Sequence, residues 1–259
     1  MPASPPFPMN LNPLKQRLRK LRLSGLADAL DVRLQEAQSR RLPPVELLEL
    51  LVEDELTVRA DRHLARGIKA ADFRELKTVD SFDFAFNPSS PAKLIHQLAT
   101  AAFVRSHEDV LLIGPPGVGK SHLAQALGLC VLKAGHSVYY RSIFDLIRDL
   151  ADKETAPLKD RQLARYLKAD LLIIDDMGIK QLPARAGELL FEVILRRYEN
   201  RSTIMTSNRP ISDWGALLGD VPSASAILDR FLHHAHVLTL EGRSFRLKNK
   251  TKDRANPDT

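Results

Sequence analysis

The chain has 259 residues, 44% apolar and 27% charged, a composition ordinary for a globular protein with one larger domain and a small one. It has no apolar run long enough to cross a bilayer, and its first ten residues lack the basic and apolar regions of a secretory signal, so a cytoplasmic protein without membrane contact is expected. The single cysteine, Cys130, excludes a disulfide within the chain. The net charge of +6, with basic clusters near both ends, favours a polyanionic partner, above all DNA.

Residues 11–77 have the apolar spacing of an all-helical domain. In the first helix the leucines share one face, and a basic face lies beside it, formed by Lys15, Arg19 and Arg22. DNA contact and an ordinary solvated surface are both open for this basic face. Pro43-Pro44 starts another helix, for which we expect apolar residues inward and glutamates outward, namely Val45, Leu48, Val52 and Leu56 against Glu46, Glu49 and Glu53.

Residues 78–91 are a predicted linker whose phenylalanines dock onto the next domain. From residue 92 short apolar runs alternate with helical stretches, which is typical of an α/β domain with a parallel sheet flanked by helices. Strands are predicted at 109–113, 137–141, 170–175, 203–207 and 236–240, and helices at 121–134, 142–151, 160–168, 186–199 and 223–233. We therefore expect a helical domain at 1–77 with ten flexible residues at its start, the linker at 78–91, and an α/β domain at 92–259 with a basic tail.

The segment GPPGVGKS matches the P-loop pattern in full and lies between a predicted strand and a predicted helix, which disfavours a chance Gly-Pro turn. Its glycines let backbone N–H groups surround phosphates at a helix N-terminus. Lys120 is predicted to reach the β- and γ-phosphates, and the Ser121 hydroxyl to coordinate Mg²⁺. The residues expected to bind ATP are Gly114, Pro115, Pro116, Gly117, Val118, Gly119, Lys120, Ser121 and His122.

Two further predicted strands end in polar residues at the edge of the sheet where the P-loop lies. After LLII, Asp175 is predicted to hold Mg²⁺ and Asp176 to polarise the attacking water. Capping of the following turn is the alternative role for Asp176. After TIMTS, Asn208 is predicted to lie beside the γ-phosphate and the water, with simple turn formation as its alternative. Lys120, Asp176 and Asn208 are thus candidate catalytic residues of an Mg²⁺-dependent ATPase.

With these motifs placed, the chain resembles the IstB-like helper ATPases of bacterial insertion sequences, which are AAA+ proteins related to the DnaC helicase loaders. The resemblance covers most of the chain and rests on the linker SFDFAFNPS, GPPGVGKS, LLIIDDMG, TSNRP and the closing GRSFR. It implies an AAA+ fold, ATP-dependent assembly of several copies on double-stranded DNA, and assistance to a transposase. A replicative helicase loader of the DnaC type is the close alternative.

The same resemblance directs attention to LDRF, where Arg230 corresponds to an arginine finger that completes the active site of a neighbouring subunit. Arg196 and Arg197 compete for this role, and a surface arginine paired with an acid is the plainer alternative. The motif GRSFR, with Arg243 and Arg246, looks like the end of the ATPase domain in this family, so a helical lid is not expected.

Several other functions are disfavoured. A small-molecule kinase would need an arginine-rich lid and an acceptor-binding segment, and a structural DNA-binding protein would not need the complete set of Lys120, Ser121 and Asp175.

Tyr139 and Tyr140 are expected to pack in the core rather than to stack on bases. The histidines at 233, 234 and 236 are explained by a helix end that meets a strand rather than by a metal site.

Overall fold

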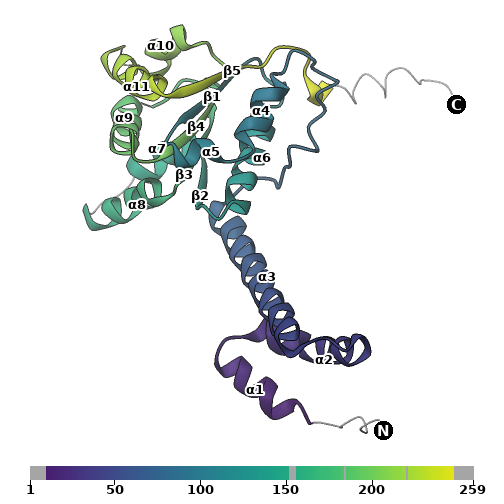
Figure 1. Ribbon diagram of the computed structural model, residues 1–259. Coiled ribbons are helices and arrows are strands. Elements are labelled where there is room, and N and C mark those ends of the chain that lie inside the picture. The colour runs from purple at the N-terminus through teal and green to yellow at the C-terminus, as the bar shows by residue number, and fades with distance from the viewer. Residues whose placement is uncertain (1–9, 152–155, 184, 220, 248–259) are drawn as a thin grey trace, which may run out of the picture. The chain divides into compact units, whose positions relative to one another are not determined.

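The computed structural model describes residues 10–151, 156–183, 185–219 and 221–247, and the chain divides into two compact units between Arg66 and Gly67 (Figure 1). The sequence-based division ends the helical domain at residue 77, whereas in the structure residues 67–77 and the linker 78–91 belong to the second unit. The first nine residues and the basic tail from residue 248 lie outside the described residues. No helix in the described ranges is long and apolar enough to cross a membrane.

The N-terminal unit is helical, as predicted, and contains α1 (Asn12–Lys20), α2 (Ser24–Arg40) and most of α3 (Pro44–Ala71). Gly25 lets α2 approach α3 closely, because a Cβ at this position would lie only 2.9 Å from the Val58 side chain. Buried Glu55 accepts a hydrogen bond of 3.1 Å from the N–H of Leu26, which satisfies one of the free donors in the first turn of α2.

The predicted orientation of α3 is wrong. The expected inward residues, Val45, Leu48, Val52 and Leu56, are each exposed by half or more. The face that packs on α2 instead carries Leu51, Glu55 and Val58. The first turns of α3 carry apolar residues on almost every side, so the periodicity alone does not select a face, and the close approach at Gly25 decides it.

The second unit is an α/β domain built on a parallel sheet with strand order β2-β3-β4-β1-β5 (Figure 1). The strands are β1 (Asp109–Ile113), β2 (Val138–Ser142), β3 (Leu171–Met177), β4 (Ser202–Ser207) and β5 (Ala235–Thr239). All five strands were predicted, to within two residues at each end. The three central strands are buried on both faces, which explains their nearly continuous apolar runs.

Helices cover both faces of this sheet. They are α4 (Ala92–Leu98), α5 (Ala102–Arg105), α6 (Lys120–Lys133), α7 (Ile143–Ala151), α8 (Ala156–Lys168), α9 (Ala186–Arg197), α10 (Trp214–Leu218) and α11 (Val221–His233). Side chains of β3 alternate between the two layers: Ile173 meets Gly128 of α6, whereas Leu172 and Ile174 join the core formed with α7 to α11. The short helices α4, α5 and α10 were not predicted, because fewer than eight residues show no clear helical period.

Within the second unit, the linker 78–91 packs through its phenylalanines against α4, α6 and the closing residues. The Phe82 ring lies edge-on to His122 at 5.5 Å, and Phe86 lies edge-on to Phe245 at 5.3 Å. Phe84 stacks at 5.5 Å from His96 in α4. The linker therefore forms one wall of the region around the P-loop helix α6.

Asp109 provides a pH-dependent contribution to stability at the start of β1. Its Oδ1 accepts a 2.6 Å hydrogen bond from the N–H of Thr203, yet burial raises the pKa of Asp109 to about 7, against the opposing effects of that N–H and of Arg197. Because the folded pKa lies above the ordinary value of 3.8, stability from this group is complete at low pH and is lost as the pH rises towards 7.

Asp109→Asn should therefore unfold at higher urea concentration than the wild type at pH 8. The stability difference should grow by up to about 1.4 kcal/mol per pH unit between roughly pH 4 and 7, and stay constant above 7. Trp214 is the single tryptophan and is buried in the same unit, so its fluorescence reports the transition. A difference that does not change with pH would show that Asp109 ionises normally in the folded protein.

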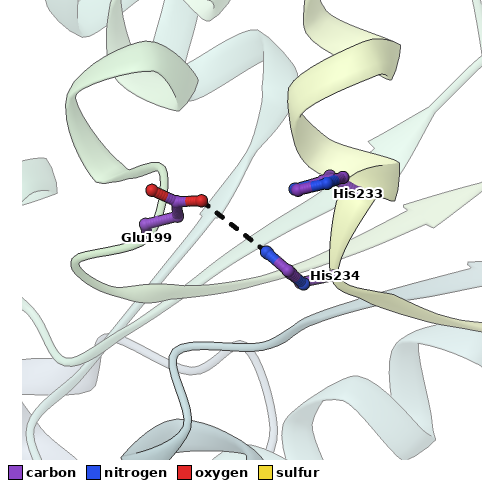
Figure 2. Close-up of side chains that lie close together, drawn as sticks. All are labelled: Glu199, His233 and His234. Atoms are coloured by element: carbon purple, nitrogen blue, oxygen red, sulfur yellow. Dashed lines mark ion pairs between the residues drawn. The ribbon is translucent and has the colours of Figure 1, made fainter.

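Three side chains gather where α9 and α11 end, and Figure 2 shows Glu199, His233 and His234 there. Their possible ligand atoms lie within 4.8 Å of one another, and all three residues are exposed. The neighbouring histidine, His236, contacts Glu108 at 2.9 Å. Within the cluster, His233 Nδ1 lies 2.8 Å from the Tyr198 hydroxyl, and His234 Nε2 lies 3.6 Å from Glu199. Each of the three histidines, His233, His234 and His236, thus contacts another side chain of the protein.

Candidate functional site

The main cavity of the second unit has a volume of about 1100 Å³ and lies where the P-loop, the end of β3 and the end of β4 meet. Gly117 and Gly119 have φ angles of 87° and 102°, a left-handed conformation that favours glycine. A Cβ on Gly119 would lie 2.4 Å from the Phe82 ring, and one on Gly117 would lie 2.1 Å from the Ser244 hydroxyl. Glycine is therefore favoured at both positions, because the φ angle is positive and because a side chain would clash with its neighbours.

Lys120 begins α6, and its ammonium group is folded back into the loop. Its Nζ donates hydrogen bonds of 2.8 Å to the carbonyl oxygens of Gly114 and Pro115. Burial lowers the pKa of Lys120 to about 8, although the nearby Asp175 carboxylate opposes this effect. A buried cation held only by two carbonyl groups fits phosphate oxygens, which are stronger acceptors for an ammonium group.

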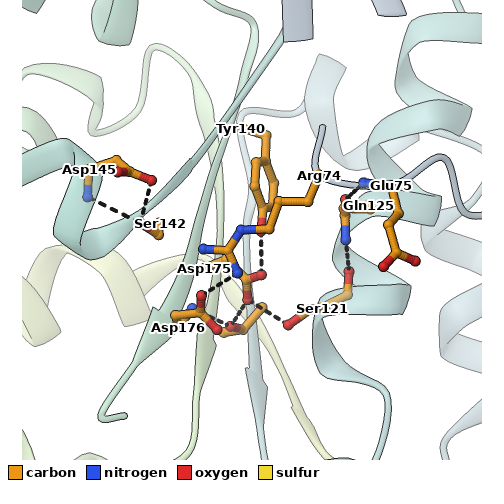
Figure 3. A network of polar contacts seen from close by, with 10 residues as sticks. Arg74, Glu75, Ser121, Gln125, Tyr140, Ser142, Asp145, Asp175 and Asp176 are labelled. Carbon is orange, nitrogen blue, oxygen red and sulfur yellow. Dashed lines mark hydrogen bonds and ion pairs between the residues drawn. The ribbon is translucent and has the colours of Figure 1, made fainter. Parts of the chain in front are cut away.

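Asp175 is the fifth residue of β3 and is fully buried. Its Oδ1 accepts a hydrogen bond of 2.9 Å from Ser121 and another from Thr206, and its Oδ2 accepts one of 2.6 Å from the Tyr140 hydroxyl (Figure 3). Burial, followed by the charge of Asp175, raises the pKa of Tyr140, so this phenol stays a donor. A carboxylate and a hydroxyl side by side are oxygen donors of the kind that Mg²⁺ prefers.

Asp176 has a φ of 69°, in the left-handed region, and lies where the register between β3 and β4 shifts. Its N–H donates to Thr206 Oγ1 at 3.1 Å, and its Oδ2 accepts a 2.6 Å hydrogen bond from Arg74 Nη1 (Figure 3). Burial raises the pKa of Asp176, repulsion from Asp175 adds to this shift, and Arg74 opposes it. The two acids of β3 therefore have different hydrogen-bond donors: Asp175 accepts from hydroxyl groups, and Asp176 accepts from the guanidinium of Arg74.

Asn208 and His122 occupy different parts of the site. Asn208 follows β4 and lines the cavity together with Asp175 and Asp176, while its N–H donates to Met177 at 2.9 Å. His122 also lines the cavity, and its Nε2 lies 3.0 Å from the Thr78 carbonyl oxygen. The histidine thus attaches the linker to the P-loop helix.

The closing segment 240–247 passes directly beside the P-loop. The N–H of Phe245 donates to the Gly117 carbonyl at 2.9 Å. The Asn87 side chain exchanges two hydrogen bonds with the backbone of Arg243, of 3.0 and 3.1 Å. Arg246 lines the cavity. The linker and the closing segment are thereby joined at the mouth of the site.

The three arginines considered for a finger role differ in accessibility. Arg230 is not among the residues that line this cavity; it bonds to the Ala226 carbonyl at 3.3 Å and stacks on Phe191 at 5.5 Å. Arg197 is 1% exposed and donates to Thr203 and to four backbone carbonyl groups, so it is a structural residue that cannot reach another subunit. Arg196 is exposed and pairs with Glu192.

The predicted basic face of α1 is partly neutralised within its own unit. Lys15 forms an ion pair with Asp31, and Arg19 pairs with Asp28 at 2.9 Å. The third residue of the predicted face, Arg22, instead lines a groove of the N-terminal unit together with Arg59, Arg62, His63 and Arg66. Arg59, Arg62 and Arg66 follow one another at three and four residues along α3, a spacing that predicts a shared helix face.

Two residues that contact the acid pair, Tyr140 and Arg74, were not among the predicted site residues. Tyr140 was expected to pack in the core; it lies in the middle of β2 opposite Ile173 of β3, and its hydroxyl reaches Asp175, two residues further along β3. Arg74 was assigned to the helical domain, and no sequence signal connects it to Asp176, 102 residues further along the chain. Only the fold brings them together.

The parallel sheet, with a P-loop after β1 and an acid pair at the end of β3, defines a P-loop nucleoside triphosphate-binding protein of the AAA+ class. The chain belongs to the IstB-like ATP binding proteins, because the model of that family matches residues 16–253. It is 38% identical over 242 residues to the insertion sequence IS21 putative ATP-binding protein of Pseudomonas aeruginosa, covering 93% of this chain and 91% of the relative. It is 34% identical over 241 residues to the IS5376 putative ATP-binding protein of Geobacillus stearothermophilus, covering 92% and 96%.

Solved structures support the fold. The crystal structure of DnaI has a TM-score of 0.53 and 21% identity, covering 65% of this chain and 89% of that one. AMPPCP-bound DnaA from Aquifex aeolicus has a TM-score of 0.55 and 21% identity, covering 73% and 58%. The resemblance stated from the sequence motifs is therefore confirmed at the level of family and fold.

Proposed function

We propose that this chain is an Mg²⁺-dependent ATPase that binds double-stranded DNA, assembles with copies of itself, and assists a transposase. The observation that carries the proposal is the contact of Ser121 with Asp175 beside Asp176, since it joins the P-loop to an acid pair. The proposed role in transposition rests on the relatives, which are described as putative ATP-binding proteins of insertion sequences.

In the proposed reaction Lys120 leaves its two carbonyl partners for the β- and γ-phosphates of ATP. Bound Mg²⁺, held by Ser121 and Asp175, would neutralise charge on the phosphates. Asp176 and Asn208 orient a water that attacks the γ-phosphorus, and Asp176 accepts its proton. The bond from the γ-phosphorus to the bridging oxygen breaks, its electrons leave with ADP, and inorganic phosphate is released.

Arg230 is proposed to act on the ATP of a neighbouring copy. It stands on α11 away from its own cavity, and its side chain is 34% exposed, so it is available to another subunit. Of the rival candidates, Arg197 is buried and Arg196 is engaged by Glu192. An arginine at the γ-phosphate stabilises the charge that develops on its oxygens.

The groove of the N-terminal unit is the proposed DNA contact; it includes Arg22 of the basic face predicted from the sequence, but not Lys15 or Arg19. Arg62 donates to the Ser24 hydroxyl at 2.5 Å and Arg66 to the Arg62 carbonyl at 3.2 Å, so neither charge is neutralised by these contacts. Lys15 and Arg19 already have carboxylate partners, which must be displaced before either binds a phosphate. Phosphate contacts of this kind carry little sequence preference.

Replacement of Arg62 and Arg66 by alanine should weaken DNA binding uniformly across sequences. The slope of log affinity against log salt should become shallower by about 2, because two phosphate contacts are lost. The double variant Lys15→Ala and Arg19→Ala removes the same charge and should change the slope little. Fluorescence anisotropy over a salt series measures both. Equal losses in the two double variants would contradict the groove assignment.

The helper role is tested by a strand-transfer assay with a transposase, taken from a neighbouring reading frame where one is encoded. Product should increase when the chain and ATP are added together, and should not increase with Lys120→Ala. Stimulation of a replicative helicase instead, with no effect on strand transfer, would move the chain to the helicase loaders.

A further inference from the structure

The segment Asp72–Glu75, called here the exit segment, directly follows α3 and is fixed to the second unit at several points. Asp72 forms an ion pair with Arg141 of β2. The Phe73 ring lies edge-on to Tyr140 at 6.2 Å and packs so closely on α6 that a Cβ on Gly128 would lie 3.0 Å from it. These contacts hold the exit segment against the sheet.

The exit segment is also connected to the P-loop. The N–H of Glu75 donates to Gln125 Oε1 at 3.0 Å, and Gln125 Nε2 donates to the Ser121 carbonyl at 3.0 Å (Figure 3). Gln125 is buried, so this relay is sheltered from water. One end of the exit segment is thus bonded to the helix that begins with Lys120.

Arg74, in the middle of the exit segment, reaches into the cavity to Asp176. Its Nη1 lies 2.6 Å from Asp176 Oδ2, and its guanidinium stands 5.9 Å from the centre of the Tyr140 ring. The Arg74 side chain is 52% exposed, whereas that of Asp176 is 16% exposed. The arginine is therefore the more accessible member of the pair and the one able to leave.

We propose that Arg74 is a positioning residue that restrains Asp176 until α3 engages DNA, an inference that rests on the proposed ATPase function. Asp176 Oδ2 already accepts a charge-assisted hydrogen bond, which makes this carboxylate a weaker acceptor for a proton of the attacking water. The guanidinium also occupies the part of the cavity lined by both acids and Tyr140. Arg74 thereby lowers the rate of hydrolysis in the absence of DNA.

The release mechanism follows from the continuity of α3. This helix runs without interruption from Pro44 to Ala71 and carries Arg59, Arg62 and Arg66 of the proposed DNA groove. Arg74 follows its last residue by three positions. Tension or rotation of α3 on DNA acts first on Asp72 and Phe73, the residues between α3 and Arg74. Once their contacts with Arg141 and α6 break, Arg74 is withdrawn and Asp176 is freed.

Steady-state hydrolysis by the full-length protein, with and without DNA, tests this proposal. Arg74→Ala should raise the DNA-free kcat about tenfold, which corresponds to about 1.4 kcal/mol, leave KM nearly unchanged, and no longer respond to DNA. Arg74→Lys keeps the positive charge and should restore a slow DNA-free rate. Arg148→Ala removes a comparable exposed arginine, paired with Asp145 outside the cavity, and should behave like the wild type. A fall in kcat, a changed KM or a preserved DNA response in Arg74→Ala would overturn the proposal.

A second measurement does not depend on hydrolysis. In nucleotide-free protein the shifts in Tm caused by Arg74→Ala and Asp176→Asn should not add in the double variant, because each removes the same ion pair. Additive shifts would overturn the pairing. If the wild type hydrolyses ATP but Arg74→Ala changes nothing, only the proposed restraint by Arg74 is contradicted. If the wild type does not hydrolyse ATP at all, the proposed ATPase function is contradicted, and the Tm measurements still test the ion pair of Arg74 with Asp176.

Discussion

Asp176→Asn is expected to bind ATP with nearly the wild-type affinity and to hydrolyse it roughly 10²–10⁴-fold more slowly. The asparagine keeps the size of the side chain and an oxygen that can hold the water, but it does not take the proton. Asp175, Ser121 and Tyr140 keep their mutual hydrogen bonds, so the proposed magnesium ligands are left intact. ATP affinity is measured by calorimetric titration and turnover by phosphate release.

Glu192→Gln is the matched control for this variant, because it neutralises an acid that pairs with an arginine at 2.9 Å outside the cavity. It should retain wild-type turnover. Wild-type turnover by Asp176→Asn would show that another group accepts the proton. Lost ATP binding in Asp176→Asn would instead assign this aspartate to the binding of the nucleotide.

Arg230→Ala should bind ATP almost normally, hydrolyse it about 10³-fold more slowly, and fail to form the ATP-dependent assembly on DNA. Lys120→Ala should lose nucleotide binding, since the P-loop loses its cation. Each variant is expected to be inactive alone, for a different reason. A mixture should recover part of the activity, because an intact P-loop from one variant meets an intact Arg230 from the other at shared interfaces.

The mixing experiment requires proof that the two variants assemble together, which tagged subunits and light scattering provide. Arg196→Ala is the control at the neighbouring helix and should retain turnover. If mixed assemblies form and stay inactive, Arg230 does not act between subunits, and Arg196 becomes the remaining candidate because Arg197 is buried.

The strands of the second unit were predictable because burial on both faces leaves a nearly continuous apolar run, as in β3 and β4. The helix faces of the N-terminal unit were not. In α3 apolar residues surround the first turns, and the packed side is decided by the single close contact of Gly25 with Val58. A contact of this kind depends on the path of the other helix, which the periodicity of α3 does not contain.

The functional site likewise has residues that the sequence predicts and residues that it does not. The P-loop and the two aspartates are contiguous motifs whose chemistry fixes their spacing, so the sequence alone suggested them. Arg74 and Tyr140 reach the same acids from segments far away in the chain. Their contacts arise from strand order and from the path of the exit segment, and neither residue type has a spacing rule that would predict them.

The most direct test of the proposed ATPase is phosphate release from ATP by the purified wild-type protein, measured beside Lys120→Ala with DNA present. We expect phosphate release that requires Mg²⁺, stops on addition of EDTA, and is absent from a folded Lys120→Ala protein. No release by the wild type, or equal release by the wild type and Lys120→Ala, would contradict hydrolysis at this site.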